Sequence, residues 1–339
     1  MGDRKDEEKS GALVRFFKTE TDLLQEFLRF WLDAKPTIIS GWNIDQFDTP
    51  YLYNRIKKVF GEEFANALSP IQQVRYNQNK KKYRIAGVSS LDYIELYRKF
   101  TYVQRSSYRL DYIGQIEVDM GKVEYEGTLD QLFENDIDKF IEYNLVDVKI
   151  VVALENKLKL IDLARAVSHM GRIPYEEVYF SSRYIEGAML TYLRKLNLVA
   201  PSKRHDASYD DSAGRFSGAY VKDPKPGRYE WVYDLDLTSM YPSTIMSLNI
   251  SPETKIGKLA GWDAEEFIKG EQKTYSFYQG KEKLRTFSTG ELKDFFNKNE
   301  VSVASNGVVY KTSQRGIIPA ILEKWFNDCL LYTSDAADE

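Results

Sequence analysis

The sequence predicts an α/β fold for the first third of the chain, because strand-like and helical patterns alternate there. The expected order is a strand at 12–17, a helix at 19–33, a strand at 37–40 and a helix at 50–60. This alternation favours a sheet with helices packed on it and functional residues at the strand ends. A length of 339 residues is enough for about two domains with sizeable cores.

Local signals set the limits of the two helices. Thr19 and Asp22 resemble a weak capping box at the start of the first helix, and Pro36 ends it. Pro50 is expected at the first position of the second helix, where a missing N–H is tolerated, with Thr49 as the cap. Asp48, two residues earlier, is compatible with an ordinary helix N-terminus, because the helix dipole stabilises a carboxylate there.

Residues 72–84 form a basic segment that reads as a loop. Its cations are interleaved with Tyr76 and Tyr83, and it contains no carboxylate. Such a segment is either a solvated loop or a contact with DNA phosphates. The cations are Arg75, Lys80, Lys81, Lys82 and Arg84.

Extended and helical patterns follow. Residues 83–88 and 91–96 read as extended, a long helix is expected from about Asp136 to Met170, and another helix begins at Ser181 or Ser182.

Tyr143 and Asp147 stand four residues apart within the long helical pattern, so they share one face of the expected helix. A tyrosine and an aspartate at this spacing are compatible with a purely structural role. A structural role is the commoner case at this spacing, and a polar site on that face is the alternative.

A strand is predicted at 229–237, because this stretch is rich in aromatic and β-branched residues. It leads directly into a helix whose first turn contains Pro242. Period-two geometry places Asp234 and Asp236 on one face of the strand. Two neighbouring carboxylates favour a hard cation such as Mg²⁺, although one of them could simply be exposed and the other a helix cap. Residues 257–300 read as charged and irregular, and 319–330 as an amphipathic helix.

Composition narrows the function classes. A formal charge of −4 and a pI near 5.6 argue against a simple DNA-coating protein, but they suit a metal-dependent nucleic-acid enzyme with acidic clusters and local basic patches. The single cysteine, Cys329, excludes a disulfide framework. No apolar run approaches the roughly 18 residues of a membrane span, and the N-terminus is too charged for a signal peptide. We therefore expect a cytoplasmic protein without a membrane anchor.

The string DLTSMYPS at 236–243 resembles motif A of the family B DNA polymerases, and NISPET at 249–254 resembles the T-even-like bacteriophage branch of that family. The resemblance implies that Asp236 and Leu237 bind the catalytic Mg²⁺ ions. It also implies that nearby backbone N–H groups bind the incoming dNTP and that a tyrosine excludes a 2′-hydroxyl. These residues are Leu237, Ser239 and Met240 for the triphosphate and Tyr241 for the sugar. Asp234 lies outside the motif.

Two further motifs resemble the 3′–5′ exonuclease of the same polymerases. GWNIDQFDTPYL at 41–52, with Asn43 and the pair Phe47-Asp48, resembles Exo II, and YNLVD at 143–147 resembles Exo III. The resemblance implies an RNase H-like fold in which Asp48 and Asp147 bind two Mg²⁺ ions and Tyr143 orients the attacking water.

The resemblance also implies a domain plan. Residues 1–170 are expected to be part of the exonuclease domain, 171–228 a connecting region, 229–318 the N-terminal part of an α+β palm, and 319–339 the start of the fingers. Residues 216–220 look like the family's hinge, and the final TSDAADE is expected to be foreign to the parent gene. The implied partners are primer-template DNA, dNTPs, a sliding clamp and other replisome proteins.

Three expected motifs are not recognised: Exo I, motif B and motif C. We therefore expect a polymerase fragment that is inactive alone. Two alternatives stay open. The chain could be one subunit of a split polymerase, or a catalytically dead DNA-binding or scaffold module on an RNase H-like fold.

Overall fold

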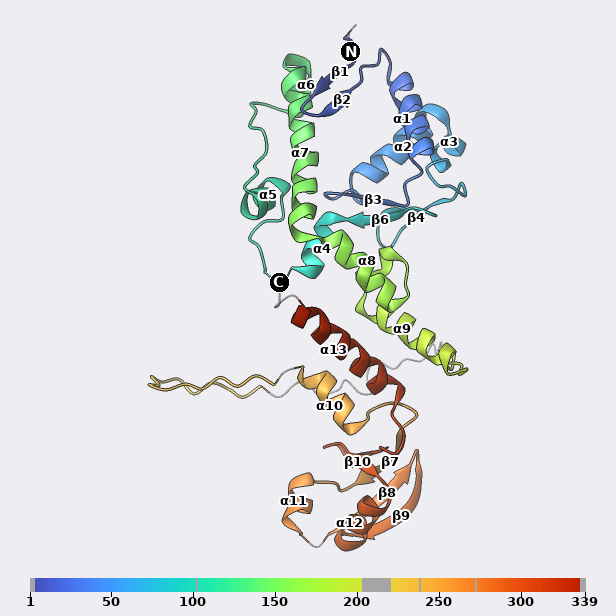
Figure 1. The fold of residues 1–339 in the computed structure, drawn as a ribbon, viewed down its shortest axis with the longest axis vertical. Coiled ribbons are helices and arrows are strands. Elements are labelled where there is room, and N and C mark those ends of the chain that lie inside the picture. Colours follow the sequence, from blue (N-terminus) through green and yellow to red (C-terminus); the bar gives the residue numbers. More distant parts are fainter. Residues whose placement is uncertain (1–3, 102, 203–220, 238, 272, 336–339) are drawn as a thin grey trace. The chain divides into compact units, whose positions relative to one another are not determined.

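The structure, a computed structural model, describes residues 4–101, 103–202, 221–237, 239–271 and 273–335, with side chains described up to residue 328 (Figure 1). The chain divides into two compact units, Met1–Gly187 and Ala188–Glu339. Each unit has its own hydrophobic core. The hinge expected at 216–220 and the last four residues of the tail lie outside the described residues.

Short strand pairs form the sheet structure of the first unit. β3 (Ile38–Gly41) pairs in parallel with β6 (Ser89–Asp92), so the ends of both strands meet at one edge. The antiparallel pairs are β1 (Glu7–Lys9) with β2 (Ala12–Val14) and β4 (Val74–Asn77) with β5 (Lys82–Ile85). Residues 72–84 are thus mostly a β-hairpin, not the expected loop. It is stabilised by the facing rings of Tyr76 and Tyr83, whose centroids are 5.0 Å apart.

The first unit also contains the predicted helices at 19–33 and 50–60. In α1 (Glu20–Ala34) the Thr19 side chain accepts a hydrogen bond of 3.1 Å from the Asp22 N–H, which confirms the expected cap. The second is α2 (Asp48–Phe60). The other helices are α3 (Glu62–Asn66), α4 (Tyr93–Phe100), α5 (Leu110–Val118), α6 (Leu129–Asn135), α7 (Ile137–Leu158), α8 (Leu160–Gly171) and the 3-10 helix Tyr175–Glu177. α9 (Ser181–Lys195) crosses from the first unit into the second.

Two expectations for this unit are wrong. Residues 91–96 are not extended throughout, because the Asp92 carboxylate accepts a hydrogen bond from the Ile94 N–H and so begins α4. The long helical pattern from Asp136 to Met170 is two helices, since Lys159 adopts the left-handed conformation (φ 53°) and separates α7 from α8.

Two hydrophobic clusters hold the described helices of the first unit. One lies among α4, α5, α7 and α8 and contains fully buried Tyr93, Tyr97, Ile113, Ile150 and Leu154. Each such side chain contributes roughly 1.5–3 kcal/mol of burial free energy. The other joins α1, α2 and β5. Because the first cluster holds the C-terminal half of α7, the N-terminal half keeps side chains available for a surface cleft.

The second unit contains an antiparallel five-stranded sheet in the order β10-β11-β7-β8-β9. The strands are β7 (Lys255–Ala260), β8 (Thr274–Gln279), β9 (Glu282–Ser288), β10 (Val301–Val303) and β11 (Val308–Lys311). α11 (Ala264–Lys269) and α12 (Thr289–Lys298) also belong to this region, and aromatic side chains fill its core. The expectation that 257–300 is irregular is wrong, because this stretch contains strands. Its charged side chains lie at the surface, while Tyr275 of β8 and Phe287 of β9 point into the core.

The NISPET turn, residues 249–254, follows α10 (Met240–Leu248) in the chain. Hydrogen bonds connect this turn to the segment that leads into α13 (Ile317–Asp335). The Asn249 amide is buried, donates to the carbonyls of Lys311 (2.7 Å) and Gln314 (2.8 Å), and accepts from the Gly316 N–H (2.9 Å). The Glu253 carboxylate accepts a hydrogen bond of 2.6 Å from the Ile317 N–H. One short turn therefore fixes the end of α10 and the beginning of α13.

The strand predicted at 229–237 is not formed. Its residues make no strand pairing within the described part of the chain, and Trp231, Tyr233 and Leu235 are 86–90% exposed. The face expected for Asp234 and Asp236 is therefore not defined by a sheet. No helix within the described ranges is long and apolar enough to cross a membrane.

Candidate active site

A cleft of about 930 Å³ lies in the first unit, where the turn after β3, α4, the start of α5, the segment 122–125 and α7 meet. Aromatic rings and cations line it together with the side chains of both exonuclease-like motifs. The motif residues on the cleft are Asn43 and Phe47 from the Exo II-like turn and Tyr143 and Asp147 from the Exo III-like helix. The cleft therefore brings residues of both motifs together, although Asp48 is not among the residues that line it.

Lys122 connects the two residues of the Exo III-like motif. Its ammonium donates hydrogen bonds of 2.8 Å to the Tyr143 hydroxyl and 2.8 Å to Asp147 Oδ2, and it lies 4.9 Å from the centre of the Tyr143 ring. Burial opposes the charge, but the bonds to Asp147 and Tyr143 raise the pKa of Lys122 overall. The tyrosine and the aspartate are thus held by one cation on one face of α7.

The second oxygen of Asp147 is the strongest sign of a missing ligand. Asp147 Oδ1 is buried and has no hydrogen-bond partner within the described residues. Leaving a buried carboxylate oxygen unsatisfied costs roughly 1–3 kcal/mol or more. An oxygen ligand of this type suits a divalent cation such as Mg²⁺. Asp147 therefore fits the expected metal.

Asp48 lies beside the cleft without lining it. It is the first residue of α2, follows Phe47 at the N-cap, and borders an adjoining cavity of about 420 Å³ that Phe47 also lines. Apolar surroundings there raise the pKa of the Asp48 carboxyl. Within the described ranges no three His, Cys, Asp or Glu side chains gather closely enough to hold a metal ion. The joint role of Asp48 and Asp147 stays a prediction.

The turn that carries Asn43 and Asp48 is tightly specified. A Cβ at Gly41 would collide with the Ile44 side chain, and Asn43 adopts a left-handed conformation with φ 64°. Asp92, at the end of the neighbouring strand β6, accepts hydrogen bonds from the N–H groups of Asn43 (2.9 Å) and Asp45 (3.1 Å). The same carboxylate that caps α4 therefore also holds this turn.

Asp92 should titrate far above an ordinary aspartate. Burial is the main cause that raises the pKa of its carboxyl to about 6, against the lowering effect of its backbone hydrogen bonds. Between about pH 4 and pH 6 the folded chain keeps a proton that the unfolded chain has lost. The contribution of Asp92 to the free energy of unfolding therefore falls as the pH rises through this window, by at most about 3 kcal/mol.

A carboxyl-detected NMR titration of the chain measures this shift directly. Asp138 is the internal reference, because its hydrogen bond with Arg4 lowers the pKa of that carboxyl to about 2. A midpoint for Asp92 near that of ordinary aspartates would show that its burial is not maintained in solution.

The motif A residues lie at the beginning of α10. Asp236 and Leu237 are in the exposed segment before it, Ser239 is the N-cap with a left-handed backbone (φ 48°), and Met240 and Tyr241 form the first turn. The Ser239 side chain does not cap the helix. A helix N-terminus suits a phosphate group. The roles of the motif A residues stay a prediction.

Sequence reasoning missed the cations of the cleft. Lys122 lies 21 and 25 residues before its two partners, so no local pattern marks it. Arg98 and Arg109 also line the cleft, and the Arg98 guanidinium lies 4.7 Å from the centre of the Tyr108 ring. The one available signal was the recurrence of Arg beside Tyr in 98–109.

Comparison with known families matches two stretches of the chain. Residues 2–113 match the exonuclease domain of DNA polymerase family B, and residues 174–332 match DNA polymerase family B itself. The first stretch ends before α7, so the Exo III-like motif lies outside both matches.

Individual relatives extend the likeness over most of the chain. The DNA-directed DNA polymerase of Escherichia phage RB69 is 33% identical over 323 residues, which is 92% of this chain and 32% of the phage protein. That of Enterobacteria phage T4 is 33% identical over 316 residues, 91% of this chain and 32% of its own length. The chain thus spans about a third of the length of these curated relatives.

A solved structure supports the fold. The family B DNA polymerase of the archaeon Pyrobaculum calidifontis superposes with a TM-score of 0.63 at 20% identity, over 97% of this chain and 38% of the archaeal one. This agreement confirms the predicted α/β class with an RNase H-like exonuclease part. The two family matches, together with the phage relatives, show that the chain belongs to DNA polymerase family B.

Proposed function

We propose that this chain is part of a DNA-directed DNA polymerase with a 3′–5′ proofreading exonuclease. The observation that carries the exonuclease proposal is the group formed by Lys122, Tyr143 and Asp147, with a buried Asp147 oxygen that lacks a partner in the described part of the chain. In this proposal residues 1–170 belong to the exonuclease domain and residues 229–318 to the palm.

Within the exonuclease site the chain's own residues orient the reaction. Lys122 fixes the Tyr143 hydroxyl, which can then hold an attacking water beside the phosphodiester. Lys122 also places a positive charge near the phosphate, where negative charge develops in the transition state. Asp147 and Asp48 would hold Mg²⁺, which lowers the pKa of bound water and stabilises the departing 3′-oxygen.

The remaining lining of the cleft suits a single-stranded 3′ end. Arg98 and Arg109 offer charges to the backbone phosphates, while Trp42 and Phe47 offer rings on which bases can stack. Phe47 is 68% exposed, so its ring is accessible for stacking. Cations with exposed rings favour an unpaired strand over a duplex.

The second half of the proposal concerns nucleotide incorporation. Asp236 and Leu237 would bind Mg²⁺, and the N–H groups of Leu237, Ser239 and Met240 would bind the triphosphate at the beginning of α10. Tyr241 is 68% exposed in the first turn, where its ring can meet the sugar of a dNTP. The implied partners are primer-template DNA and a sliding clamp. The implied location is the cytoplasm of a host cell, supported by the phage origin of two relatives.

The test uses the whole polymerase of this proposal. With primer-template, dNTPs and Mg²⁺ it should extend a matched primer and should remove a mismatched 3′ nucleotide before extending it. A folded protein that binds DNA but performs neither reaction would refute the proposal and support a non-catalytic DNA-binding module.

Lys122→Met should reduce the release of 3′-terminal nucleotides by about 10–100-fold, which is typical for residues that orient a ligand or a water at a metal site. The change removes the cation that fixes both Tyr143 and Asp147. Quenched-flow measurement with single-stranded DNA gives the rate. Lys149→Met removes an exposed lysine on the same helix and is the matched control. Equal rates for the two variants would contradict the role of Lys122.

A further inference from the structure

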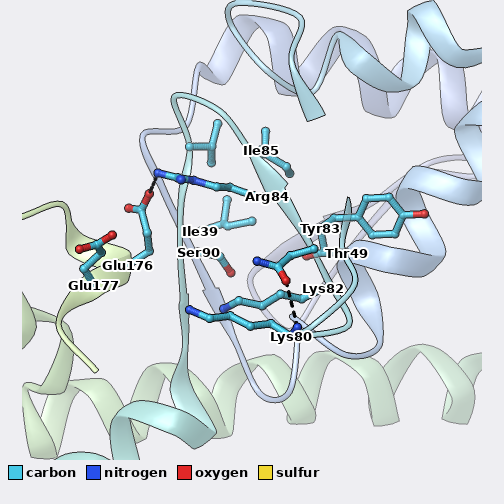
Figure 2. Close-up of a pocket in the computed structure, with 12 residues that line it drawn as sticks. Ile39, Thr49, Lys80, Lys82, Tyr83, Arg84, Ile85, Ser90, Glu176 and Glu177 are labelled. Atoms are coloured by element: carbon cyan, nitrogen blue, oxygen red, sulfur yellow. Dashed lines mark hydrogen bonds and ion pairs between the residues drawn. The ribbon is translucent and has the colours of Figure 1, made fainter. Parts of the chain in front are cut away.

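Lys82 differs from the other cations of the β4–β5 hairpin because its charge is directed into the protein. Its ammonium lies 2.6 Å from Asp45 Oδ2, and Asp45 is only 5% exposed. Ser90 of strand β6 donates a hydrogen bond of 2.6 Å to the other oxygen, Asp45 Oδ1. Figure 2 shows Lys82 and Ser90 on the same side of the small cavity beside the hairpin.

The neighbouring hairpin cations have other environments. Arg84 pairs with Glu176 at 3.0 Å (Figure 2). The Lys80 ammonium lies 4.2 Å from the centre of the Phe180 ring. Lys81 is exposed. Some cations of the hairpin are therefore exposed to solvent, whereas the Lys82 ammonium pairs with a buried carboxylate.

Asp45 belongs to the turn that presents the exonuclease residues. Its own N–H donates to Asp92, and the Ile44 carbonyl next to it accepts from the Thr49 N–H (2.9 Å) at the start of α2. Phe47 and Asp48 follow within three residues. The turn is therefore held from β6 through Asp92 and from the hairpin through Lys82.

The ion pair between Lys82 and Asp45 holds the turn rigidly to the hairpin. Removing Lys82 would leave the buried Asp45 carboxylate without its cation, which is unfavourable because the charge stays buried. The hairpin therefore cannot separate from the turn without a large cost, and the base of the hairpin and the turn behave as one body.

We propose that Lys82 is a positioning residue of the exonuclease site, which acts through Asp45 to fix the turn that carries Phe47 and Asp48. The effect of Lys82 on catalysis rests on the proposed exonuclease function. The ion pair between Lys82 and Asp45 does not depend on that function. Lys82 is accordingly not a ligand of DNA, although it stands in the basic run of the hairpin.

The first test measures hydrogen exchange of the backbone amides at 43–49 in the 339-residue chain. Lys82→Met should accelerate exchange there by about 10-fold or more, whereas Lys82→Arg should restore protection. Lys58→Met removes an exposed lysine of α2 and should leave the turn unchanged. The double variant Lys82→Met/Asp45→Asn leaves no unpaired charge, so it should fold normally yet still exchange rapidly at the turn.

The second test separates positioning from DNA binding by steady-state nucleolysis of single-stranded DNA in the whole polymerase. Lys82→Met should lower kcat by about 10-fold and leave KM nearly unchanged, whereas a lost phosphate contact would raise KM. Unchanged exchange at 43–49, or a purely KM effect, would overturn the inference. A wild-type protein without nucleolysis, but with the expected exchange difference, would instead refute the proposed function alone.

Discussion

Asp147→Asn should lower the release of 3′-terminal nucleotides by about 10³-fold and leave primer extension intact. The carboxylate combines a bond to Lys122 with a buried oxygen that has no partner among the residues the structure describes. An amide would bring N–H donors and no charge to that position. A metal ligand contributes several kcal/mol of transition-state stabilisation, and each 1.4 kcal/mol corresponds to a factor of about ten. Single-turnover digestion of a 3′-labelled oligonucleotide measures the rate.

The matched control is Glu142→Gln, which changes an exposed carboxylate on the same helix to an amide. It should degrade DNA at the wild-type rate. If Asp147→Asn stays within about threefold of wild type, Asp147 is not part of the exonuclease site and the tyrosine-aspartate pair of α7 is structural.

Asp236→Asn should have the opposite selectivity, with nucleotide incorporation reduced by about 10³-fold and nucleolysis unchanged. The magnitude has the same physical origin, the loss of a charged metal ligand where negative charge develops on the phosphate. Single-nucleotide incorporation on a primer-template, followed at saturating dNTP, gives kcat without an effect of weakened binding.

Asp234 supplies the control for this experiment. It stands two residues before Asp236 in the same exposed segment, but it lies outside the motif. Asp234→Asn should therefore incorporate nucleotides within about threefold of wild type. Equal losses in the two variants would show that the Asp-x-Asp pair acts as a unit and that the assignment of Asp236 alone is wrong.

Local signals were sufficient to place the first helices, but not to fix both of their ends. The Thr19 cap depends only on near neighbours and is found as expected. The second helix was expected to begin at Pro50 with Thr49 as its cap, but it begins at Asp48, with Phe47 at the N-cap and no side-chain cap. Tyr143 and Asp147 share a face because helix periodicity requires it. Their approach to the Exo II-like turn followed from the family resemblance.

Features that depend on distant partners were not visible in the sequence. The parallel pairing of β3 with β6 joins residues about 50 positions apart, and Asp92 holds the turn from that second strand. Lys122 could not be distinguished from other lysines until α7 was placed beside it. The segment 229–237 has strand-forming composition, but a strand needs a hydrogen-bonded neighbour, and the described residues supply none.

The Asn249 turn has a consequence for the order of folding. Its amide bonds to backbone groups 62–67 residues later in the chain, at the last residue of β11 and in the segment that follows it. Loop-closure entropy opposes such a contact until the intervening residues are compact. We therefore expect the C-terminal end of α10 to become fixed only after the sheet has formed.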